Sequence, residues 1–317
     1  MKTIEISPGV DMPIIGIGTW EMKDEAVLRN IIETGLEAGY RLIDTATSYR
    51  NEKFIGKALS ELLPKFGLQR SDIIVTSKLS PADQGKGRAR EAVLRSLDNL
   101  GFDYIDLYII HFPGSAGLNP SDEGNKILRK ESWEELENLQ REGKLRAIGV
   151  SNYMVPHLTD LLSYAAVKPA LNQCEFHPHL IQQKLREYCK QSAIHFQAYS
   201  SLGSAHHKSK LTNEKLLQDI AARHNASISQ ILLAWAICQE ISVLPKTSSP
   251  NHLLDNLGAL NVSLSNDEIE DISKLDRDVH YCWNPNPVVS TVDIATVLHI
   301  YVLIQSFITS NCKSAKI

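Results

Sequence analysis

The sequence predicts an α/β protein: a single (β/α)8 TIM barrel with an N-terminal β-hairpin in front of it and an atypical C-terminal tail behind it. The 317 residues suit this fold, because α/β barrels routinely reach this length as one domain. Short β-branched runs alternate with longer stretches of helical period, which indicates βαβ units around a parallel sheet. An open dinucleotide-binding sheet is disfavoured, because GIGTWE at the end of the first run lacks the third glycine of GxGxxG.

Eight strand-like runs follow one another, and a segment of helical pattern comes after each of them. The runs are PIIGIG (13–18), RLIDTA (41–46), DIIVTSK (72–78), YIDLYIIH (104–111), LRAIGVSN (145–152), ALNQCEF (170–176), IHFQAYS (194–200) and ISVLPKT (241–247). The first five helices are expected over residues 24–39, 52–63, 88–100, 131–142 and 155–165. Ahead of the first run, TIEISPGVDMP has an SPG turn signal between two apolar stretches, which predicts a small hairpin. The barrel should span residues 1–287, with residues 288–317 as a separate extension.

Composition narrows the classes of partner and compartment. The formal net charge of -4 leaves no basic stripe, so no nucleic-acid partner is expected. Five cysteines are an odd number without CxxC spacing, which favours a reducing compartment over a disulfide scaffold. The first residues have no long apolar core, so we expect no signal peptide and a cytosolic protein. EFHPHL holds two histidines without a third ligand, so no metal is expected there.

Four polar side chains follow three consecutive strands of the predicted barrel. The second strand should end at Asp44, with Tyr49 in the loop after it, while Lys78 ends the third run and His111 the fourth. Chemistry in these barrels takes place at the C-terminal ends of the strands, so the four side chains should meet on one face. Any one of them alone would most often be structural, but an acid, a phenol, an amine and an imidazole together favour a proton-transfer site.

The chemistry that suits this set is the reduction of a carbonyl group. Negative charge develops on the carbonyl oxygen during hydride transfer, and an acid must supply a proton there. A phenol with a pKa of about 10 is a reluctant donor, but a nearby ammonium favours the phenolate and lowers that pKa. We therefore interpret Tyr49 as the acid, Lys78 as its tuning cation and Asp44 as the partner of Lys78. His111 would orient the substrate.

These residues lie in segments that resemble the aldo-keto reductase superfamily from about residue 3 to about residue 287. LIDTATSYRNE is similar to that family's D-T-A-x-x-Y-x-N-E signature, IVTSKL carries its lysine and LYIIHFP its histidine. LRAIGVSNY and LPKTSSPNHLLDN resemble its two later signatures. The resemblance, which is to aldose reductase-like and glyoxal reductase-like members, implies a cytosolic and usually monomeric oxidoreductase. It would bind NADPH without a Rossmann domain and reduce small-molecule carbonyl substrates to alcohols by hydride transfer.

The resemblance also implies individual contacts to the cofactor and the substrate. At the nicotinamide end the implied residues are Thr19, Trp20, Asp44, Ser151, Asn152, Gln173 and Tyr199, the last of which would stack on the ring. Further along the cofactor they are Ser200, Leu202 and Gly203 at the pyrophosphate, Lys246, Thr247, Ser248 and His252 at the 2′-phosphate, and Asp255 and Asn256 at the adenine. The substrate would meet Trp20, Tyr49, His111 and Phe112. The residues themselves support Lys246, because a cation beside hydroxyl groups suits a phosphate monoester.

The chain departs from the family pattern around the cofactor and the substrate. His252 stands where the family usually has an arginine, and an imidazole cannot make the bidentate pair of a guanidinium. NADPH should therefore be preferred less strongly than usual, and NADH can be tolerated. Phe112 occupies a position that is commonly tryptophan, and Ser80 one that is often aromatic, so the pocket should be less aromatic and wider. The polar loop GSAGLNPSDEGNKILRKE (114–131) favours small aldehydes and dicarbonyls over steroids, and Trp283 is interpreted as a packing residue.

The tail STVDIATVLHIYVLIQSFITSNCKSAKI differs most from the family. Residues 294–312 carry no charged side chain apart from His299, and their number is close to the roughly 20 residues that span a bilayer. Thr296, Gln305 and Ser306 weaken a membrane anchor, so a helix packed on the barrel or a disordered extension is favoured. The tail also keeps open a second class of function, a non-catalytic regulatory or structural relative that binds the cofactor. The intact set of four polar residues favours the enzyme.

Overall fold

Eight parallel strands form the central sheet of the computed structural model, which describes residues 1–204 and 207–290. They are β3 (Ile17–Gly18), β4 (Leu42–Asp44), β5 (Ile74–Leu79), β6 (Ile105–Ile110), β7 (Leu145–Ser151), β8 (Leu171–Glu175), β9 (His195–Tyr199) and β10 (Ser242–Val243). Each strand pairs with the next one along the chain, and parallel bridges from Ile15 to Val243 and from Gly18 to Lys246 join the first strand to the last. The predicted (β/α)8 barrel is confirmed.

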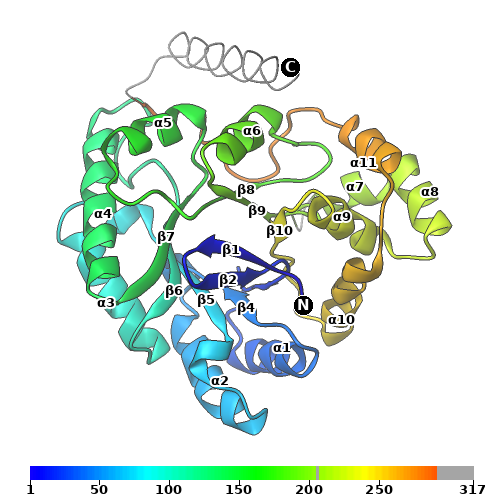
Figure 1. The fold of residues 1–317 in the computed structure, drawn as a ribbon, viewed down its shortest axis with the longest axis horizontal. Coiled ribbons are helices and arrows are strands. Elements are labelled where there is room, and N and C mark those ends of the chain that lie inside the picture. The colour runs from blue at the N-terminus through cyan, green and yellow to red at the C-terminus, as the bar shows by residue number, and fades with distance from the viewer. Residues whose placement is uncertain (205–206, 291–317) are drawn as a thin grey trace, which may run out of the picture.

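Helices surround the barrel and connect its strands (Figure 1). They are α1 (Glu25–Glu37), α2 (Glu52–Lys65), α3 (Arg88–Leu100), α4 (Gly124–Arg141), α5 (Val155–Tyr164), α6 (Gln183–Gln191), α7 (Lys208–Thr212), α8 (Lys215–Arg223), α9 (Ile228–Ile237), α10 (Pro250–Leu257) and α11 (Asn266–Ser273). Local sequence explains their ends: Asp24, for example, accepts a hydrogen bond from the Val27 amide and so caps the first turn of α1.

Four of the five predicted helices agree with the structure within two residues at each end, but α4 begins at Gly124 rather than at residue 131. Its first turns come from a segment that the sequence analysis assigned to a polar loop. Two polar residues there are buried anchors: the Asn125 amide oxygen accepts from the Ser115 amide, and Arg129 donates to the Pro113 carbonyl. Their polarity serves contacts inside the protein, which a composition-based loop prediction misses.

The predicted hairpin is present and closes one end of the barrel. Strands β1 (Thr3–Ser7) and β2 (Val10–Pro13) pair antiparallel. The hairpin places Ile6, Val10 and Met12 in one apolar cluster with inward-facing strand residues such as Leu107 and Leu171. A second, larger cluster fills the space between the strands and the helices. The hairpin therefore covers the N-terminal ends of the strands and leaves the opposite mouth for chemistry.

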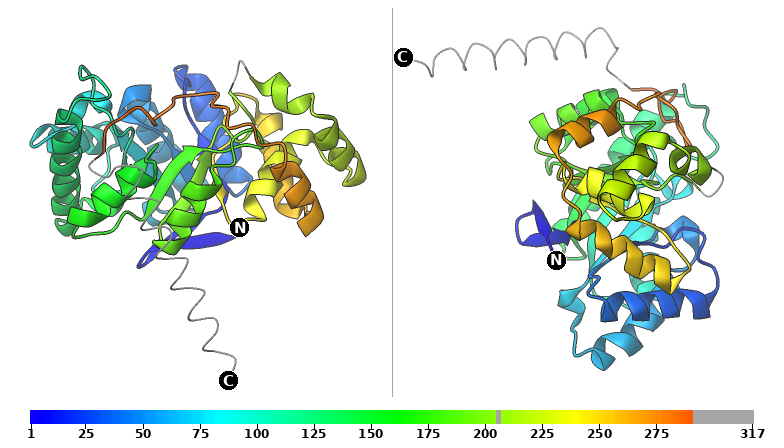
Figure 2. Two further views of the ribbon diagram at one scale, coloured as in Figure 1. Left: turned by 90° about the horizontal axis from the view of Figure 1, so that it is seen from above. Right: turned by 90° about the vertical axis from the view of Figure 1, so that its right-hand side faces the viewer.

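A C-terminal strap, residues 276–290, crosses that opposite mouth of the barrel (Figure 2). Near its start the Val279 amide donates to the His179 carbonyl, and near its end the Val289 amide donates to the Pro120 carbonyl. Contacts with the barrel thus continue past residue 287. The predicted boundary between the barrel (1–287) and a separate extension (288–317) stays a prediction. The predicted apolar segment 294–312 lies outside the described residues, among which no helix is long and apolar enough to cross a membrane.

The contact between α2 and α3 predicts one mutational effect on stability. A Cβ atom on Gly56 would lie 2.2 Å from the Leu100 carbonyl oxygen, which belongs to the backbone and cannot rotate away. Gly56→Ala gains helix propensity of about 1 kcal/mol, but overpacking of this kind costs about 1–3 kcal/mol. We expect a lower free energy of unfolding in urea melts. Ser60→Ala, an exposed change in the same helix, should stay at the wild-type value, and equal stability of the two variants would contradict the packing argument.

Candidate active site

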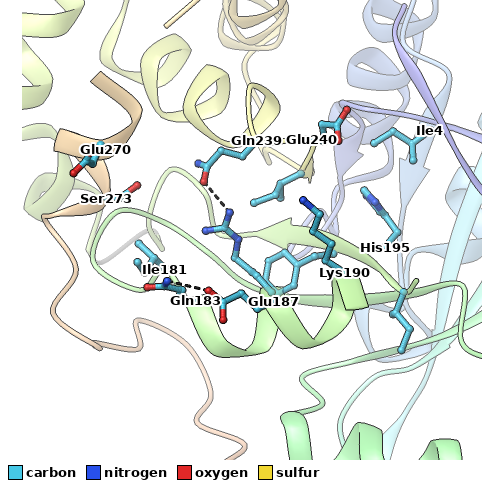
Figure 3. A pocket seen from close by; sticks show the side chains of 14 residues that line it. Ile4, Ile181, Gln183, Glu187, Lys190, His195, Gln239, Glu240, Glu270 and Ser273 are labelled. Atoms are coloured by element: carbon cyan, nitrogen blue, oxygen red, sulfur yellow. Dashed lines mark hydrogen bonds between the residues drawn. The ribbon is translucent and has the colours of Figure 1, made fainter. Parts of the chain in front are cut away.

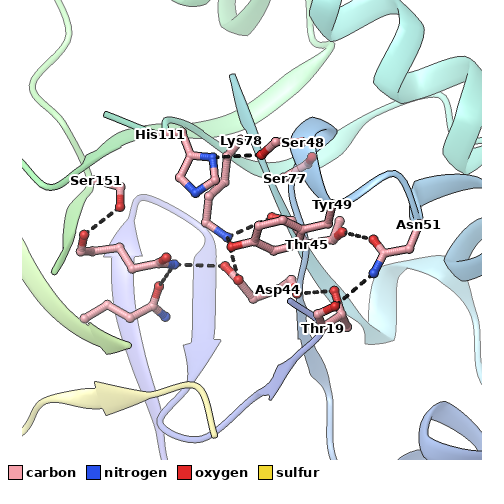
Figure 4. A network of polar contacts seen from close by, with 12 residues as sticks. Thr19, Asp44, Thr45, Ser48, Tyr49, Asn51, Ser77, Lys78, His111 and Ser151 are labelled. Carbon is pink, nitrogen blue, oxygen red and sulfur yellow. Dashed lines mark hydrogen bonds and ion pairs between the residues drawn. The ribbon is translucent and has the colours of Figure 1, made fainter. Parts of the chain in front are cut away.

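The four polar residues predicted from the strand ends meet at the C-terminal mouth of the barrel (Figure 4). Asp44 is the last residue of β4, Lys78 lies one residue before the end of β5, and His111 follows β6 directly. Tyr49 ends η1 (Thr47–Tyr49), a short 3-10 helix in the loop after β4. Because β4, β5 and β6 are neighbours in the parallel sheet, their C-terminal ends bring these side chains together.

Asp44 and Lys78 form a buried ion pair at the centre of the site. The Lys78 ammonium lies 2.5 Å from one Asp44 carboxylate oxygen and 2.8 Å from the Thr45 carbonyl oxygen. The Lys78 side chain is 0% exposed. Burial alone would lower the pKa of Lys78, but Asp44 and the nearby Tyr49 outweigh it and hold that pKa above its usual value. Lys78 is therefore a permanent cation at neutral pH.

The phenol of Tyr49 lies next to this cation. Its hydroxyl oxygen accepts a hydrogen bond of 3.3 Å from the Lys78 ammonium, which also lies 4.8 Å from the centre of the phenol ring. The sequence analysis expected a lowered pKa for Tyr49, but the pKa in the structure is raised. Burial raises the pKa of Tyr49 and outweighs Lys78, which acts in the predicted, lowering direction. The phenol is protonated at neutral pH, as a proton donor must be.

His111 is a neutral hydrogen-bonding group rather than an acid. Burial, helped by the charge on Lys78, lowers its pKa from 6.5 to about 3. Its Nδ1 atom lies 3.3 Å from the Ser48 hydroxyl, and its ring packs edge-on to Tyr49 with 5.7 Å between ring centres. When Ser48 donates to Nδ1, Nε2 carries the proton and can donate to a carbonyl oxygen beside Tyr49.

A chain of hydrogen bonds joins the ion pair to residues that the family resemblance implied for the nicotinamide. The Gln173 amide donates to the second Asp44 oxygen at 2.8 Å, and the Ser151 hydroxyl donates to the Gln173 carbonyl at 2.7 Å. The Asn152 amide donates to the His111 carbonyl at 2.9 Å and accepts from the Tyr199 hydroxyl at 2.7 Å. The ends of β7, β8 and β9 are thus fixed relative to Asp44 and His111.

Two positioning residues belong to the D-T-A-x-x-Y-x-N-E segment but were not assigned from the sequence. Thr45 donates to the Asn51 side chain at 2.6 Å, and Asn51 donates to the carbonyls of Thr19 and Met22 at 2.9 and 3.2 Å. Thr19 in turn donates to the Asp44 carbonyl at 2.8 Å. Thr45, Asn51 and Thr19 are 0% exposed, so they brace the loop that carries Tyr49. Their place in the signature was the signal that could have identified them.

The other implied cofactor residues form two groups, one partly buried and one mostly exposed, whose chemistry fits phosphate. Ser200, Leu202 and Gly203 form the turn after β9, where the buried Ser201 hydroxyl has no hydrogen-bond partner among the described residues. Between β10 and α10 the exposed residues are Lys246, Ser248 and His252, with partly buried Thr247 beside them. Phosphate oxygens can accept hydrogen bonds from the Ser201 hydroxyl in the first group, and from Lys246 and the hydroxyls beside it in the second.

Two residues implied at the adenine have contacts within the protein. The Asp255 carboxylate accepts from the Ser227 hydroxyl at 2.7 Å and from the Gln230 amide at 3.0 Å. These bonds hold the start of α9 against α10. Asn256, in the same helix, is 2% exposed. Contact of either residue with adenine stays a prediction.

Trp283 corrects the sequence analysis on the substrate side. It was interpreted as a packing residue, but its side chain is 50% exposed. Its ring lies edge-on to His111 with 5.7 Å between centres, and to Phe112 with 6.5 Å. Trp20, which the sequence analysis placed beside the substrate, is also open to solvent, at 44% exposed. Trp283 therefore adds an aromatic surface that was not expected from Phe112 and Ser80.

Other features of the described residues do not compete with this site. The cavity of about 620 Å³ shown in Figure 3 is lined mainly by residues of α6 and α11, the start of β9 and the segment just before β10, and includes none of the predicted site residues. Among residues 1–204 and 207–290 no group of three histidine, cysteine, aspartate or glutamate side chains could hold a metal ion. The polar network at the barrel mouth is the candidate active site.

The lowered pKa of His111 leads to a prediction by NMR titration. In the folded protein the His111 imidazole should stay neutral from pH 8 to pH 5, because its pKa is about 3. The unfolded chain takes up this proton near pH 6.5, so the contribution of His111 to stability is full above that pH and is lost toward pH 3. The measurement is the chemical shift of the imidazole C–H protons as a function of pH. The signal that disappears in His111→Asn is the one that belongs to His111. A midpoint between pH 5 and pH 7 would contradict the proposed environment.

Comparison with known proteins agrees with this geometry. The sequence profile of the Aldo/keto reductase family matches residues 14–277. The chain is 35% identical over 284 residues to a glyoxal reductase of Bacillus subtilis, covering 90% of this chain and 96% of the relative. It is 35% identical over 295 residues to aldose reductase C of Dictyostelium discoideum, covering 89% and 91%. The crystal structure of a Bombyx mori aldo-keto reductase in complex with NADP superposes with a TM-score of 0.81 at 27% identity, covering 93% and 95%. The chain belongs to the aldo/keto reductase family of oxidoreductases.

Proposed function

We propose that the chain is an NADPH-dependent reductase that converts aldehydes and ketones to alcohols with Tyr49 as the general acid. The observation that carries this proposal is the placement of one protonated phenol 3.3 Å from a buried ammonium, beside a neutral imidazole. The expected substrates are small aldehydes and dicarbonyls, with aldoses as a further class. The names of the glyoxal reductase and aldose reductase relatives support this choice.

Each of the four residues has a role in this reaction. NADPH, when bound, would supply the hydride. Tyr49 donates its proton to the developing alkoxide, and Lys78 stabilises the phenolate that remains. Asp44 holds Lys78 in place 2.5 Å away, and His111 donates a hydrogen bond that orients the carbonyl oxygen. General acid catalysis of this kind contributes typically about 10²–10⁴-fold to the rate.

The cofactor would lie along the residues that the family resemblance implies. Ser151, Asn152 and Gln173 already form a connected network beside Asp44, where a carboxamide could exchange hydrogen bonds with them. The unused Ser201 hydroxyl supports pyrophosphate binding, and Lys246 supports the 2′-phosphate. The NADP complex of the Bombyx mori relative supports the choice of cofactor. We further propose a cytosolic monomer, as the sequence analysis predicts.

The competing hypothesis is a non-catalytic relative that only binds the cofactor. The connected network from Asp44 through Lys78 to Tyr49 argues against it, because a buried charge is costly to keep without a use. Cofactor oxidation separates the two hypotheses, since a binding protein would hold NADPH without turnover.

Replacement of Tyr49 tests the proposed acid. We expect purified Tyr49→Phe to lose at least about 100-fold in kcat for methylglyoxal and a nitrobenzaldehyde, because the proton donor is gone. Binding of NADPH, followed by its fluorescence, should persist. Tyr188→Phe changes a phenol that bonds to Thr159 instead, and is the matched control that should retain full activity. Near-normal turnover by Tyr49→Phe would remove Tyr49 from this role, and NADPH binding without turnover in the wild type would favour the non-catalytic hypothesis.

Replacement of His252 tests the weakened discrimination between cofactors. His252 lies in the first turn of α10 with its side chain exposed near Lys246 along the chain. We expect His252→Arg to lower KM for NADPH by about tenfold and to leave KM for NADH unchanged, because only a guanidinium pairs with a phosphate through two parallel hydrogen bonds. Steady-state kinetics with both cofactors measure this. An equal change for both cofactors would show that position 252 does not meet the 2′-phosphate.

A further inference from the structure

Glu175 is a buried carboxylate at the mouth of the barrel that the proposed reaction does not use. It ends β8 and is 1% exposed. One of its oxygens accepts from the Tyr281 amide at 2.7 Å and lies 3.1 Å from His177 Nε2. The other accepts from the Cys282 amide at 3.2 Å and lies 3.2 Å from His280 Nδ1. A carboxylate has about four acceptor positions, and here four neighbours take them up.

These contacts make Glu175 a permanent anion in the folded chain. Burial alone would raise its pKa, but the hydrogen bonds from His177, His280 and the Tyr281 amide outweigh it and lower the pKa to about 2. Amide groups of two consecutive strap residues point at this one charge. The carboxylate therefore fixes the backbone at Tyr281 and Cys282 as well as the side chain of His280.

A second set of contacts prevents the strap from sliding along this anchor. The Tyr281 ring stacks on His177 with 4.4 Å between centres and on His207 with 4.7 Å, and its hydroxyl hydrogen-bonds to His179. Beyond the mouth, Arg129 holds the Val289 carbonyl at 2.8 Å. The strap is thus attached to the barrel before and after one residue, and that residue faces the site.

That residue is Trp283, which follows directly after the anchored segment 280–282. No residue that the structure describes buries its ring deeply, since it is 50% exposed, so its position beside His111 depends on the backbone that carries it. An aromatic side chain offers a large contact surface at a small entropic cost. A carbonyl held between Tyr49 and His111 would extend its apolar part toward this ring.

We propose that Glu175 is a positioning residue which, by anchoring residues 280–282, holds Trp283 as an apolar wall of the carbonyl site, and that this wall strengthens the binding of those aldehydes among the expected substrates that have an aromatic or apolar body. The kinetic part rests on the proposed reductase function. The placement of Trp283 by Glu175 does not, because it can be observed without turnover.

The test compares Glu175→Gln, Trp283→Ala and the double variant in the full-length chain. Glutamine is close in size to glutamate but presents an NH2 group to a backbone amide or an imidazole, so the strap should loosen while the barrel still folds. We expect each single variant to raise KM for a nitrobenzaldehyde about fivefold or more, and to change KM for methylglyoxal and both kcat values much less. The double variant should show the effect of Trp283→Ala alone, because Glu175 acts through Trp283.

A readout without turnover separates this proposal from the proposed function. The fluorescence of Trp283 is obtained by subtracting the emission of a Trp283→Phe protein from that of the same protein with Trp283 present. We expect acrylamide to quench this signal more strongly when Glu175 is replaced by Gln than when Glu175 is present. Glu137→Gln is the matched control, because Glu137 is also a buried carboxylate that accepts a backbone hydrogen bond, 2.8 Å from the Val167 amide, but lies in α4. It should change neither KM nor the quenching.

The outcomes are distinct. Additive effects in the double variant, or Glu175→Gln with wild-type KM and wild-type quenching, would overturn the proposal. A wild-type protein that does not oxidise NADPH would contradict the proposed function, while the quenching comparison would still decide whether Glu175 places Trp283. If Glu175→Gln fails to fold, Glu175→Asp provides the same comparison, because the shorter carboxylate keeps its charge but withdraws from the Tyr281 and Cys282 amides.

Discussion

The buried ion pair between Asp44 and Lys78 is the interaction on which the rest of the site depends. It joins two neighbouring strands, places an ammonium under the Tyr49 hydroxyl, and leaves a second carboxylate oxygen for Gln173 on β8. Loss of one partner of such a pair typically costs about 3–5 kcal/mol, because the other charge stays buried without compensation. The same contact therefore constrains the barrel and the chemistry, so a chain that loses it should lose both activity and part of its stability.

Two carboxylates at strand ends serve different parts of the mouth. Asp44 holds a cation, and through it sets the surroundings of the proton donor. Glu175 holds two backbone amides and two imidazoles, and through them sets the path of the strap. Both are nearly inaccessible to solvent, and both are satisfied by several donors, which is the condition under which a buried charge is tolerated.

The barrel, the hairpin and the four central residues could be predicted from the sequence, because strand ends are local features and a parallel sheet brings them to one face. Three features could not. The start of α4 was taken for a loop because Asn125 and Arg129 are polar, yet both are buried by partners outside the helix. The pKa of Tyr49 depends on burial, which charge spacing does not reveal. Trp283 lies against His111 on a strap in which residue 281 is tied to residue 175, and both contacts join segments distant in sequence.

This arrangement separates the reaction from the choice of substrate. Asp44 and Lys78 lie on β4 and β5, His111 directly follows β6, and Tyr49 lies in the loop after β4. The closed sheet fixes the positions of these three strands. The wall that faces these residues is carried by a strap without regular secondary structure, held by a few side-chain and backbone contacts with the barrel. Substitutions in the strap or at its anchors can therefore move or remove the wall while the proton-transfer groups keep their geometry. Loops on a rigid barrel vary in this way at little cost in stability, so specificity can change within such a family while the chemistry is retained.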